Sequence, residues 1–395
     1  MAAAAAVLVV AAGVVLALAL GRGNRRGPAP TARSKPHPQA VAPGAERRRT
    51  AHRASGLHGL EIALQDNAVF LERGYYDRDV AFRQARELGV TWMRTNLLWS
   101  RVQPTPGGFD WSQYDSLVDT ARRHGVSVEM SLTGPVPAWA SGDGRVGPFR
   151  PDPVAFRRFA RAAAMHFRNR VTRYSIWNEP NHDAWLTPAA EAPAIYRRLY
   201  EAGWSAIKAA DPHAEVLFGE TGAYAEAGQT APLAFLRAVA CRGCPELHAD
   251  GYAHHPYEFT DPPEFSYPGA DNVTIGTLGR LETALDELAA KHLLATPDGK
   301  PLPIYLTEFG YFASGRRALP ASVRADWTVR AYAIALKMYP RVRQMLQYLL
   351  VSPPAHFPGG YFDTSIVSLS GRPEEPFAAV AAWASRERRA GRVAR

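Results

Sequence analysis

The chain has few of the residues that build metal sites or disulfide frameworks. Only two cysteines occur among 395 residues, Cys241 and Cys244, in the short stretch C-R-G-C. A structural zinc site needs four ligands and no second cysteine pair exists, so the sequence predicts no metal site. The pair follows an expected helix and precedes Pro245, where a redox motif would instead begin a helix. A local disulfide in an exported protein is the interpretation, with free thiols as the alternative.

Excess positive charge is absent from the middle of the chain, although the whole chain carries a net charge of +9. Residues 22–53 hold nine Lys or Arg against one Glu, and the residues after Ala384 hold five Arg against one Glu. These two segments leave the rest of the chain with a net charge of −3. Proteins that bind nucleic acid carry basic residues on the folded body, so the sequence argues against a nucleic-acid partner.

Charged residues are also missing from residues 2–20, a stretch nearly long enough to cross the hydrocarbon core of a bilayer. It predicts a signal peptide, with a cleavage site at Ala17-Leu18-Ala19, or a membrane anchor. The protein is therefore expected to be exported, and to meet a membrane only through this segment if it is not cleaved. One feature disagrees, because arginines follow the apolar stretch and none precedes it, which by the positive-inside rule favours a cytoplasmic body.

Residues 21–54 are rich in Pro, Arg, Ala and Gly without periodicity, and predict a disordered basic linker. From residue 55 to residue 385, short apolar runs alternate with longer amphipathic segments, the pattern of a parallel sheet with crossover helices. The last residues, 386–395, read as a basic tail. The expected strands are 60–64, 91–97, 127–132, 173–177, 215–218, 251–255, 304–307 and 345–351. The expected helices are 77–88, 114–124, 153–168, 193–210, one from 232, 278–292, 323–338 and 376–385.

Eight strand–helix units predict a single (β/α)8 TIM barrel over residues 55–385. A doubly wound sheet would fit the same alternation, but no glycine-rich phosphate turn follows the first strand. In a barrel, functional side chains gather at the carboxyl ends of the strands. The fourth expected strand ends at Asn178-Glu179-Pro180-Asn181, and the seventh ends at Thr307-Glu308. Two glutamates at corresponding strand ends suit acetal hydrolysis, in which one carboxyl donates a proton and the other attacks or stabilises the anomeric carbon.

Other strand ends supply groups that fit this chemistry. Arg94 follows Met93 on the second strand, where its charge would keep one glutamate ionised. Tyr257, just past His255 on the sixth strand, could donate a hydrogen bond to the same carboxylate, and Asn178 could bind a substrate hydroxyl. His254 is expected to point away from His255 because neighbouring strand residues face opposite sides. Pro180 is expected to hold Glu179 in extended geometry.

Aromatic side chains lie at or just beyond several strand ends, and their faces suit the apolar patches of sugar rings. The candidates for such contacts are Trp139, Trp185, Tyr311 and Tyr348.

These residues carry a resemblance to clan A of the retaining glycoside hydrolases. The phrases I-W-N-E-P-N, Y-L-T-E-F-G-Y and G-P-V-P-A-W-A are most similar to family 39, which includes β-xylosidases and related exported polysaccharide hydrolases. The resemblance spans residues 57–384 and implies a barrel enzyme that needs no cofactor. It implies Glu179 as the acid/base, Glu308 as the nucleophile and Asn178 as a contact of the substrate 2-hydroxyl. Arg94, His255 and Tyr257 would form the supporting shell.

The chain departs from the clan at the eighth strand. Many members end that strand on a tryptophan that floors the −1 subsite, whereas here the strand reads Q-Y-L-L-V-S and Tyr348 is the candidate replacement. The predicted function is hydrolysis of β-glycosidic bonds in an oligo- or polysaccharide. A transglycosylase that remodels an envelope polymer and a non-catalytic glycan-binding barrel are the alternatives. The sequence does not set the sugar, the linkage or the oligomeric state.

Overall fold

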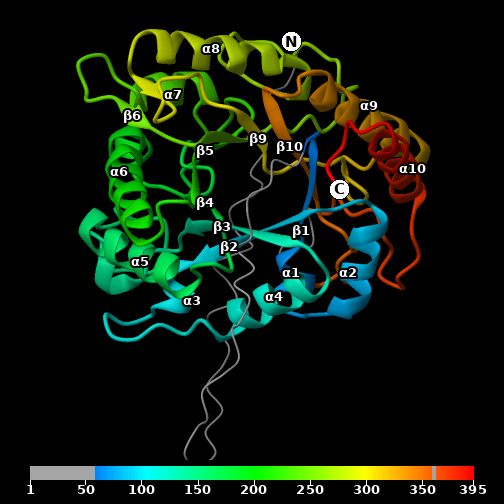
Figure 1. Cartoon of the computed structure of the whole chain (residues 1–395), viewed down its shortest axis with the longest axis horizontal. Helices are drawn as coiled ribbons and strands as arrows, with labels where there is room; N and C mark the ends of the chain where they lie inside the picture. The colour runs from blue at the N-terminus through cyan, green and yellow to red at the C-terminus, as the bar shows by residue number, and fades with distance from the viewer. Residues whose placement is uncertain (1–57, 358–361) are drawn as a thin grey trace, which may run out of the picture.

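The computed structural model describes residues 58–357 and 362–395, so the predicted export segment and basic linker lie outside the described residues. Eight parallel strands close into a barrel in the order β1-β10-β9-β7-β5-β4-β3-β2, which confirms the predicted (β/α)8 fold (Figure 1). Within these residues no helix is long and apolar enough to cross a membrane. The barrel strands are β1 (Glu61–Gln65), β2 (Trp92–Leu98), β3 (Ser127–Thr133), β4 (Arg173–Ile176), β5 (Glu215–Gly222), β7 (Gly251–His255), β9 (Ile304–Leu306) and β10 (Val342–Tyr348).

The helices form a ring around the outside of the barrel (Figure 1). Helix starts follow from local chemistry: the Asp77 carboxylate caps α2 by accepting from Val80 N at 2.8 Å, and Asp152 caps α5 ahead of a first-turn proline. The eight helices predicted from the sequence are all present, and the short α1 and α3 are additional. The α-helices are α1 (Asn67–Phe70), α2 (Arg78–Glu87), α3 (Trp99–Val102), α4 (Ser112–Arg123), α5 (Pro153–His166), α6 (Ala192–Ala210), α7 (Pro232–Val239), α8 (Leu278–Ala290), α9 (Ala321–Lys337) and α10 (Glu375–Arg389).

The two faces of the sheet carry different side chains. Residues that point outward, such as Met93, Met130 and Phe218, belong to the large apolar core between strands and helices. The barrel interior holds only small apolar clusters, for example Leu217 with Ala253 and Tyr305, and is otherwise filled by buried polar and charged side chains. The barrel interior therefore contains several of the ionisable groups that the fold buries.

Two features outside the eight barrel strands differ from the sequence-based expectations. The residues expected to form a basic tail continue α10 to Arg389, and Val393 then pairs with Leu60 beside β1, with both side chains buried. A small parallel sheet of β6 (Leu247–His248) and β8 (Leu294–Ala295), missed by the sequence reading, lies outside the barrel. Just before β6, Cys241 and Cys244 form a disulfide with their Cα atoms 5.4 Å apart.

Candidate active site

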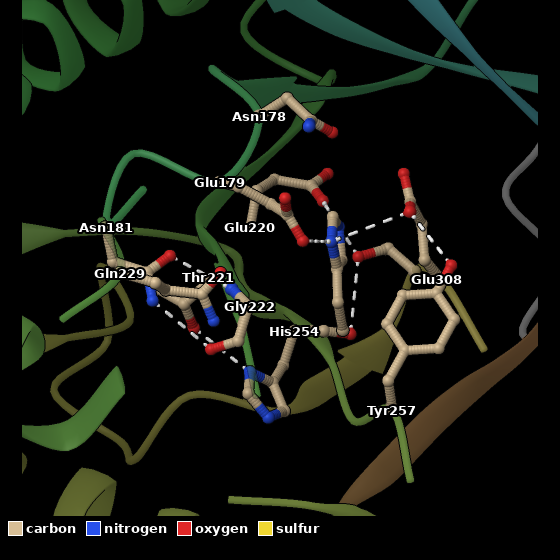
Figure 2. A network of polar contacts seen from close by, with 12 residues as sticks. Asn178, Glu179, Asn181, Glu220, Thr221, Gly222, Gln229, His254, Tyr257 and Glu308 are labelled. Carbon is tan, nitrogen blue, oxygen red and sulfur yellow. Dashed lines mark hydrogen bonds and ion pairs between the residues drawn. The ribbon is translucent and has the colours of Figure 1, made fainter. Parts of the chain in front are cut away.

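The carboxyl ends of five barrel strands bring eight polar side chains together. Figure 2 shows Glu179, Glu220 and Glu308 turned toward one another, with Tyr257 beside Glu308. Their side chains are joined by hydrogen bonds that involve β2, β5, β7 and the residues just beyond β4, β7 and β9. We call this set the polar cluster; it comprises Arg94, Asn178, Glu179, Glu220, His255, Tyr257, Thr307 and Glu308.

Arg94 on β2 is the central cation of the polar cluster, and its side chain is completely buried. Its Nη1 donates to Glu308 Oε1 at 2.8 Å, and its Nη2 donates to Glu220 Oε2 at 2.9 Å and to Asn178 Oδ1 at 2.8 Å. Gln65 on β1 accepts a further hydrogen bond from Nη1. The fifth N–H, on Nε, donates to Glu220 Oε1 at 3.3 Å. Because all five N–H groups of the planar guanidinium are used, Arg94 fixes the positions of two carboxylates and two amides at once.

Glu308 accepts hydrogen bonds on both of its oxygens. Arg94 occupies Oε1, and the Tyr257 hydroxyl donates to Oε2 at 3.1 Å. Burial raises the pKa of Glu308, and the charges of His255 and Arg94 offset that effect only in part. Two donors on two oxygens are nevertheless the hydrogen-bond pattern of an ionised carboxylate, which is the form a nucleophile needs.

His255 on β7 connects the two glutamates predicted from the sequence. Its Nδ1 lies 3.0 Å from Glu179 Oε1 and 3.7 Å from Glu308 Oε2. A single ring nitrogen therefore contacts both carboxyl groups, so that these two oxygens lie at most 6.7 Å apart. Burial opposes a charge on His255, but the carboxylates of Glu308, Glu179 and Glu220 raise its pKa to about 10. These carboxylates therefore favour the charged form of the imidazole.

Glu220 is a third buried carboxylate that the sequence reading missed. It accepts from Arg94 at 2.9 Å and from Thr307 Oγ1 at 2.9 Å, and its Oε2 lies 2.7 Å from His255 Nε2. Burial would raise the pKa of Glu220, but Arg94 and His255 lower it to about 2. Its backbone carbonyl also accepts from Glu179 N at 2.8 Å. Glu220 thus contacts the supports of both predicted catalytic residues.

A β-bulge explains why Glu220 points inward. Gly219 pairs with Ala253 and Thr221 pairs with His254, so Glu220 is left over in β5, and its φ is +52°. Simple alternation from the inward-facing Leu217 would have placed it outside the barrel. The sequence signal was available, because G-E-T-G continues the fifth strand beyond Phe218, where the expected strand stopped.

The backbone at the end of β4 differs from the extended geometry expected before Pro180. Trp177 has φ +73° and Glu179 has φ +39°, both in the left-handed region that side-chain-bearing residues rarely adopt. The expectation that Pro180 would hold Glu179 extended is therefore wrong. The bond from Glu179 N to Glu220 O and the buried Asn181 amide, which bonds Gly222 N and O, hold the turn against β5.

The pKa of Glu179 is lowered, whereas a general acid at rest needs a raised pKa in order to hold its proton. Burial would raise it, but the hydrogen bond and charge of His255 lower it. His254 takes no part, as predicted: it faces the outer side, near Thr221 and Val273, and burial lowers its pKa to about 4. The electrostatics of the resting site therefore favour a proton on His255 over a proton on Glu179.

The four aromatic candidates lie in different surroundings. Tyr348 ends β10 and is partly exposed. Burial raises its pKa, and the charge of Glu308 raises it further. Its ring centroid is 5.7 Å from that of Phe362. Tyr311 is only 2% exposed, which leaves no ring face open to a ligand.

The two tryptophans make no hydrogen bond to the polar cluster. Trp139 packs edge-on against Trp99 and donates to Gln103 O at 3.2 Å. It lines a separate hollow of about 440 Å³ together with Ser141 and Arg198. Trp185 is partly buried, and its backbone carbonyl accepts from Trp177 Nε1 at 2.9 Å. Of the two tyrosine candidates, Tyr348 is the one whose pKa the charge of Glu308 raises.

The donor set of the polar cluster is that of an ion-pair network. Each of its three carboxylates accepts from a nitrogen donor of Arg94 or His255. Among residues 58–357 and 362–395, no group of three or more His, Cys, Asp or Glu is arranged to hold a metal ion. A larger hollow of about 1200 Å³ opens at the other end of the barrel, near Glu215, Tyr305 and Arg343, and includes no member of the polar cluster.

Comparison with protein families and curated sequences gives one match. Residues 76–143, which contain α2, β2 and β3, match the model of the family Glyco_hydro_42, described as beta-galactosidase. A search of curated proteins finds no sequence that matches the chain. The matched segment includes Arg94 but neither of the two predicted catalytic glutamates.

Solved structures of glycoside hydrolases share the fold of the whole described body. A family 39 glycoside hydrolase from Bacteroides cellulosilyticus is 21% identical with a TM-score of 0.64, over 83% of this chain and 64% of that one. An exo-beta-1,4-mannosidase from an Opitutaceae bacterium is 17% identical with a TM-score of 0.59, over 86% and 61%. A GH5_18 protein from Streptomyces cattleya in complex with GlcNAc is 18% identical with a TM-score of 0.60, over 84% and 81%. The chain spans less than two thirds of the first two proteins, and at these identities the likeness concerns the fold.

The resemblance to the glycoside hydrolases of clan A is confirmed by the family match, and the solved structures show that the chain shares their fold. The family match is a glycoside hydrolase family, and family 39 structures are among the structural neighbours.

Proposed function

We propose that the protein is a retaining β-glycoside hydrolase that acts on an oligo- or polysaccharide by double displacement. The observation that carries the proposal is the pair Glu179 and Glu308, which approach the same nitrogen of His255 at 3.0 Å and 3.7 Å. The two carboxyl groups of retaining enzymes lie about 5–5.5 Å apart, whereas inverting enzymes leave about 6.5–9.5 Å for a water molecule. The shared contact keeps Glu179 Oε1 and Glu308 Oε2 at most 6.7 Å apart, below nearly all of the inverting range, and so supports the retaining arrangement.

In the first step Glu308 attacks the anomeric carbon. The glycosidic C–O bond breaks with its electron pair moving to the departing oxygen, and Glu179 delivers a proton to that oxygen. Arg94 and Tyr257 each hold one oxygen of Glu308, so the carboxylate needs little reorientation to attack. The product of this step is an ester between the sugar and Glu308.

In the second step Glu179 acts as a base. It takes a proton from a water molecule, the oxygen of that water attacks the anomeric carbon, and the ester bond to Glu308 breaks. The carboxylate of Glu308 is restored with its bonds to Arg94 and Tyr257. Two displacements at one carbon give a product with the same anomeric configuration as the substrate.

Support for a sugar substrate comes from the surroundings of the carboxylates and from the neighbours. The Asn178 amide is fixed through its oxygen by Arg94, which leaves its NH₂ group for a substrate hydroxyl. Tyr348, braced by Phe362, would supply the floor under the sugar ring in place of a tryptophan. Neighbours titled as β-xylosidases and as an exo-β-1,4-mannosidase favour the β configuration. We also propose export, on the basis of residues 2–20.

Chemical rescue tests the assignment of the two glutamates. Glu179→Ala should lower hydrolysis of an aryl β-glycoside by about 10²–10⁴-fold, and azide should restore turnover because a small anion needs no general base. The rescued product should be the β-glycosyl azide. In Glu308→Ala, the matched control, azide can only take the place of the nucleophile and should give the α-glycosyl azide.

Product analysis by NMR separates the alternatives. Retention of configuration in the wild-type product supports double displacement, and inversion contradicts it. Sugar products longer than the substrate would indicate a transglycosylase. Binding of a glycan with no turnover in any substrate of the panel would indicate a non-catalytic barrel.

A further inference from the structure

We infer that Glu220 is a positioning residue that keeps the proton of the general acid inside the site by holding His255 as an imidazolium. The inference rests on the proposed function and deepens it by naming where the acid proton resides before substrate binds. It concerns a residue on β5, a strand whose end contributes neither the acid/base nor the nucleophile.

The geometry of His255 requires an additional proton. Both ring nitrogens face carboxylate oxygens, with Nδ1 3.0 Å from Glu179 and Nε2 2.7 Å from Glu220. A neutral imidazole has one N–H donor, so it can satisfy only one of these two contacts. Either the ring is charged, or Glu179 carries the second proton and donates it to Nδ1. In both cases one proton lies between Glu179 and His255.

Glu220 decides which of these groups can release that proton. It is fully buried, and Arg94 and Thr307 donate to it, which keeps it ionised as the partner of Nε2–H. A fixed negative charge 2.7 Å from the ring stabilises the imidazolium when the site is empty. As the glycosidic bond breaks, the Nδ1 proton passes to Glu179, and Glu179 delivers it to the departing oxygen. This leaves Glu179 ionised, ready to act as the base of the second step, and a neutral ring whose Nε2–H still donates to Glu220.

This arrangement reconciles the two opposed observations in the resting site. The pKa of Glu179 is lowered by His255, yet a general acid must hold a proton at the pH of reaction. The proton is not lost to solvent, because it is stored one hydrogen bond away. Glu220 also bonds Arg94, which holds Glu308, so a single carboxylate couples the protonation of both catalytic groups.

Other charged and titratable groups lie near Glu220 or His255 and also affect the charge of the site. They are Arg94 on β2, Glu129 on β3, Glu179 after β4, Tyr196 on α6, His254 on β7, Tyr257 after β7 and Glu308 after β9. Arg94 and the imidazolium supply two positive charges against the carboxylates of Glu179, Glu220 and Glu308. Removing the charge of Glu220 therefore leaves the site more positive and lowers the pKa of every remaining acid.

The test is Glu220→Gln, which keeps the shape of the side chain and removes its charge. Both limbs of the pH profile of kcat/KM should move toward acid by about one unit or more, since a charge within hydrogen-bond distance shifts a pKa by about 1–3 units. The loss should be larger for glycosides with a poor leaving group, which need the acid proton, than for nitrophenyl glycosides. Glu220→Asp, which keeps the charge, should lower kcat and leave the limbs near their wild-type positions.

Glu129→Gln is the matched control. Glu129 is a second fully buried glutamate, 3.9 Å from Arg94, and no hydrogen bond joins it to His255 in the described structure. Its substitution should displace the alkaline limb much less than Glu220→Gln does. Equal displacement by both variants would show a general charge effect and would overturn the role assigned to Glu220.

A direct measurement uses the histidine ring itself. In protein labelled with ¹⁵N at the imidazoles, the His255 signal, assigned by its loss in His255→Asn, should titrate near pH 10 in the wild type and at least about one unit lower in Glu220→Gln. Titration of wild-type His255 near its ordinary value of about 6.5 overturns the inference without any variant. An unchanged pKa in Glu220→Gln overturns it as well. A shifted His255 in a protein with no glycosidase activity would contradict the proposed function and support the coupling of Glu220 to His255.

Discussion

The barrel contains a buried arginine near each of its ends, and the two have opposite surroundings. Arg94, toward the carboxyl end, meets three hydrogen-bonded residues of the polar cluster, Glu220, Glu308 and Asn178. Arg173, at the amino end of β4, bonds Glu61 at 2.8 Å, Glu215 at 2.7 Å and Gln344 at 2.8 Å. Glu129 lies between them, 3.9 Å from each guanidinium.

The difference lies in what else surrounds each guanidinium. Arg173 lies between two aromatic rings, with its guanidinium carbon 3.7 Å from the centroid of Trp92 and 4.5 Å from that of Tyr305. Such faces stabilise a cation and offer no proton to exchange. Arg94 instead shares its carboxylates with His255, a group whose charge can change. The comparison teaches that a buried arginine between aromatic faces stabilises the barrel, whereas a buried arginine whose carboxylate partners also contact a histidine supports proton transfer.

The largest effect is expected from a variant that removes the ion pairs of Arg173 at the amino end of the barrel. Arg173→Met should lower the free energy of unfolding by about 3–5 kcal/mol, because it leaves the fully buried Glu129 and the largely buried Glu61 without this cation. The kcat of the folded fraction should stay within a few-fold of wild type, since no residue of the polar cluster contacts Arg173. Urea unfolding and steady-state kinetics on the same preparation check both statements. A large loss of kcat with unchanged stability would contradict the structural role.

A matched control for that variant is Glu215→Gln. The Glu215 side chain is 41% exposed, so its ion pair with Arg173 is screened by water. The loss of stability should be at most about 1 kcal/mol.

A smaller effect is expected from a variant that removes the cation of the polar cluster at the carboxyl end of the barrel. Arg94→Met should lower kcat/KM by about 10²–10³-fold, the usual loss when one preorganised donor is removed from an active site. Arg94 lowers the pKa of Glu308, so without it that pKa rises and the acid limb of the pH profile moves to higher pH. A pH-rate profile measures this shift. Arg94→Lys, which keeps the charge, should leave the limb closer to its wild-type position, and an unmoved limb in both variants would contradict the assignment.

The smallest effect concerns Glu129, the carboxylate between the two arginines. Burial raises its pKa to about 7, so its stabilising contribution is present below its ordinary value and is lost as pH rises through about 7. Glu129→Gln, which can still bond Gln344, should therefore gain stability relative to wild type between pH 5 and pH 8, by about 1 kcal/mol. Paired urea titrations at the two pH values measure the difference. A variant that loses stability relative to wild type as pH rises would show that Glu129 is ionised and supports both arginines.

The sequence located the strands and most of the polar cluster for a common physical reason. Apolar runs must alternate with amphipathic helices to form this barrel, so each strand end could be read from where its run stops. Asn178, Glu179, His255 and Glu308 all stand at such ends and all lie in the polar cluster. Glu220 was missed because the expected fifth strand stopped at Phe218, and because a β-bulge, which alternation cannot foresee, turns an outward position inward. The left-handed φ of Glu179 was missed because its cause is a hydrogen bond to another strand.

By itself the sequence determined the class of fold and the kinds of side chain available at the barrel mouth, since both follow from patterns that are local in the chain. Only the tertiary structure decided which side chains share a hydrogen bond and where the proton resides. Glu179 and Glu220 come from different strands, and they meet His255 through contacts between residues 76 and 35 positions apart in the chain. The pKa of each group depends on the charges that these contacts bring to within about 4 Å, and that information is absent from any single segment.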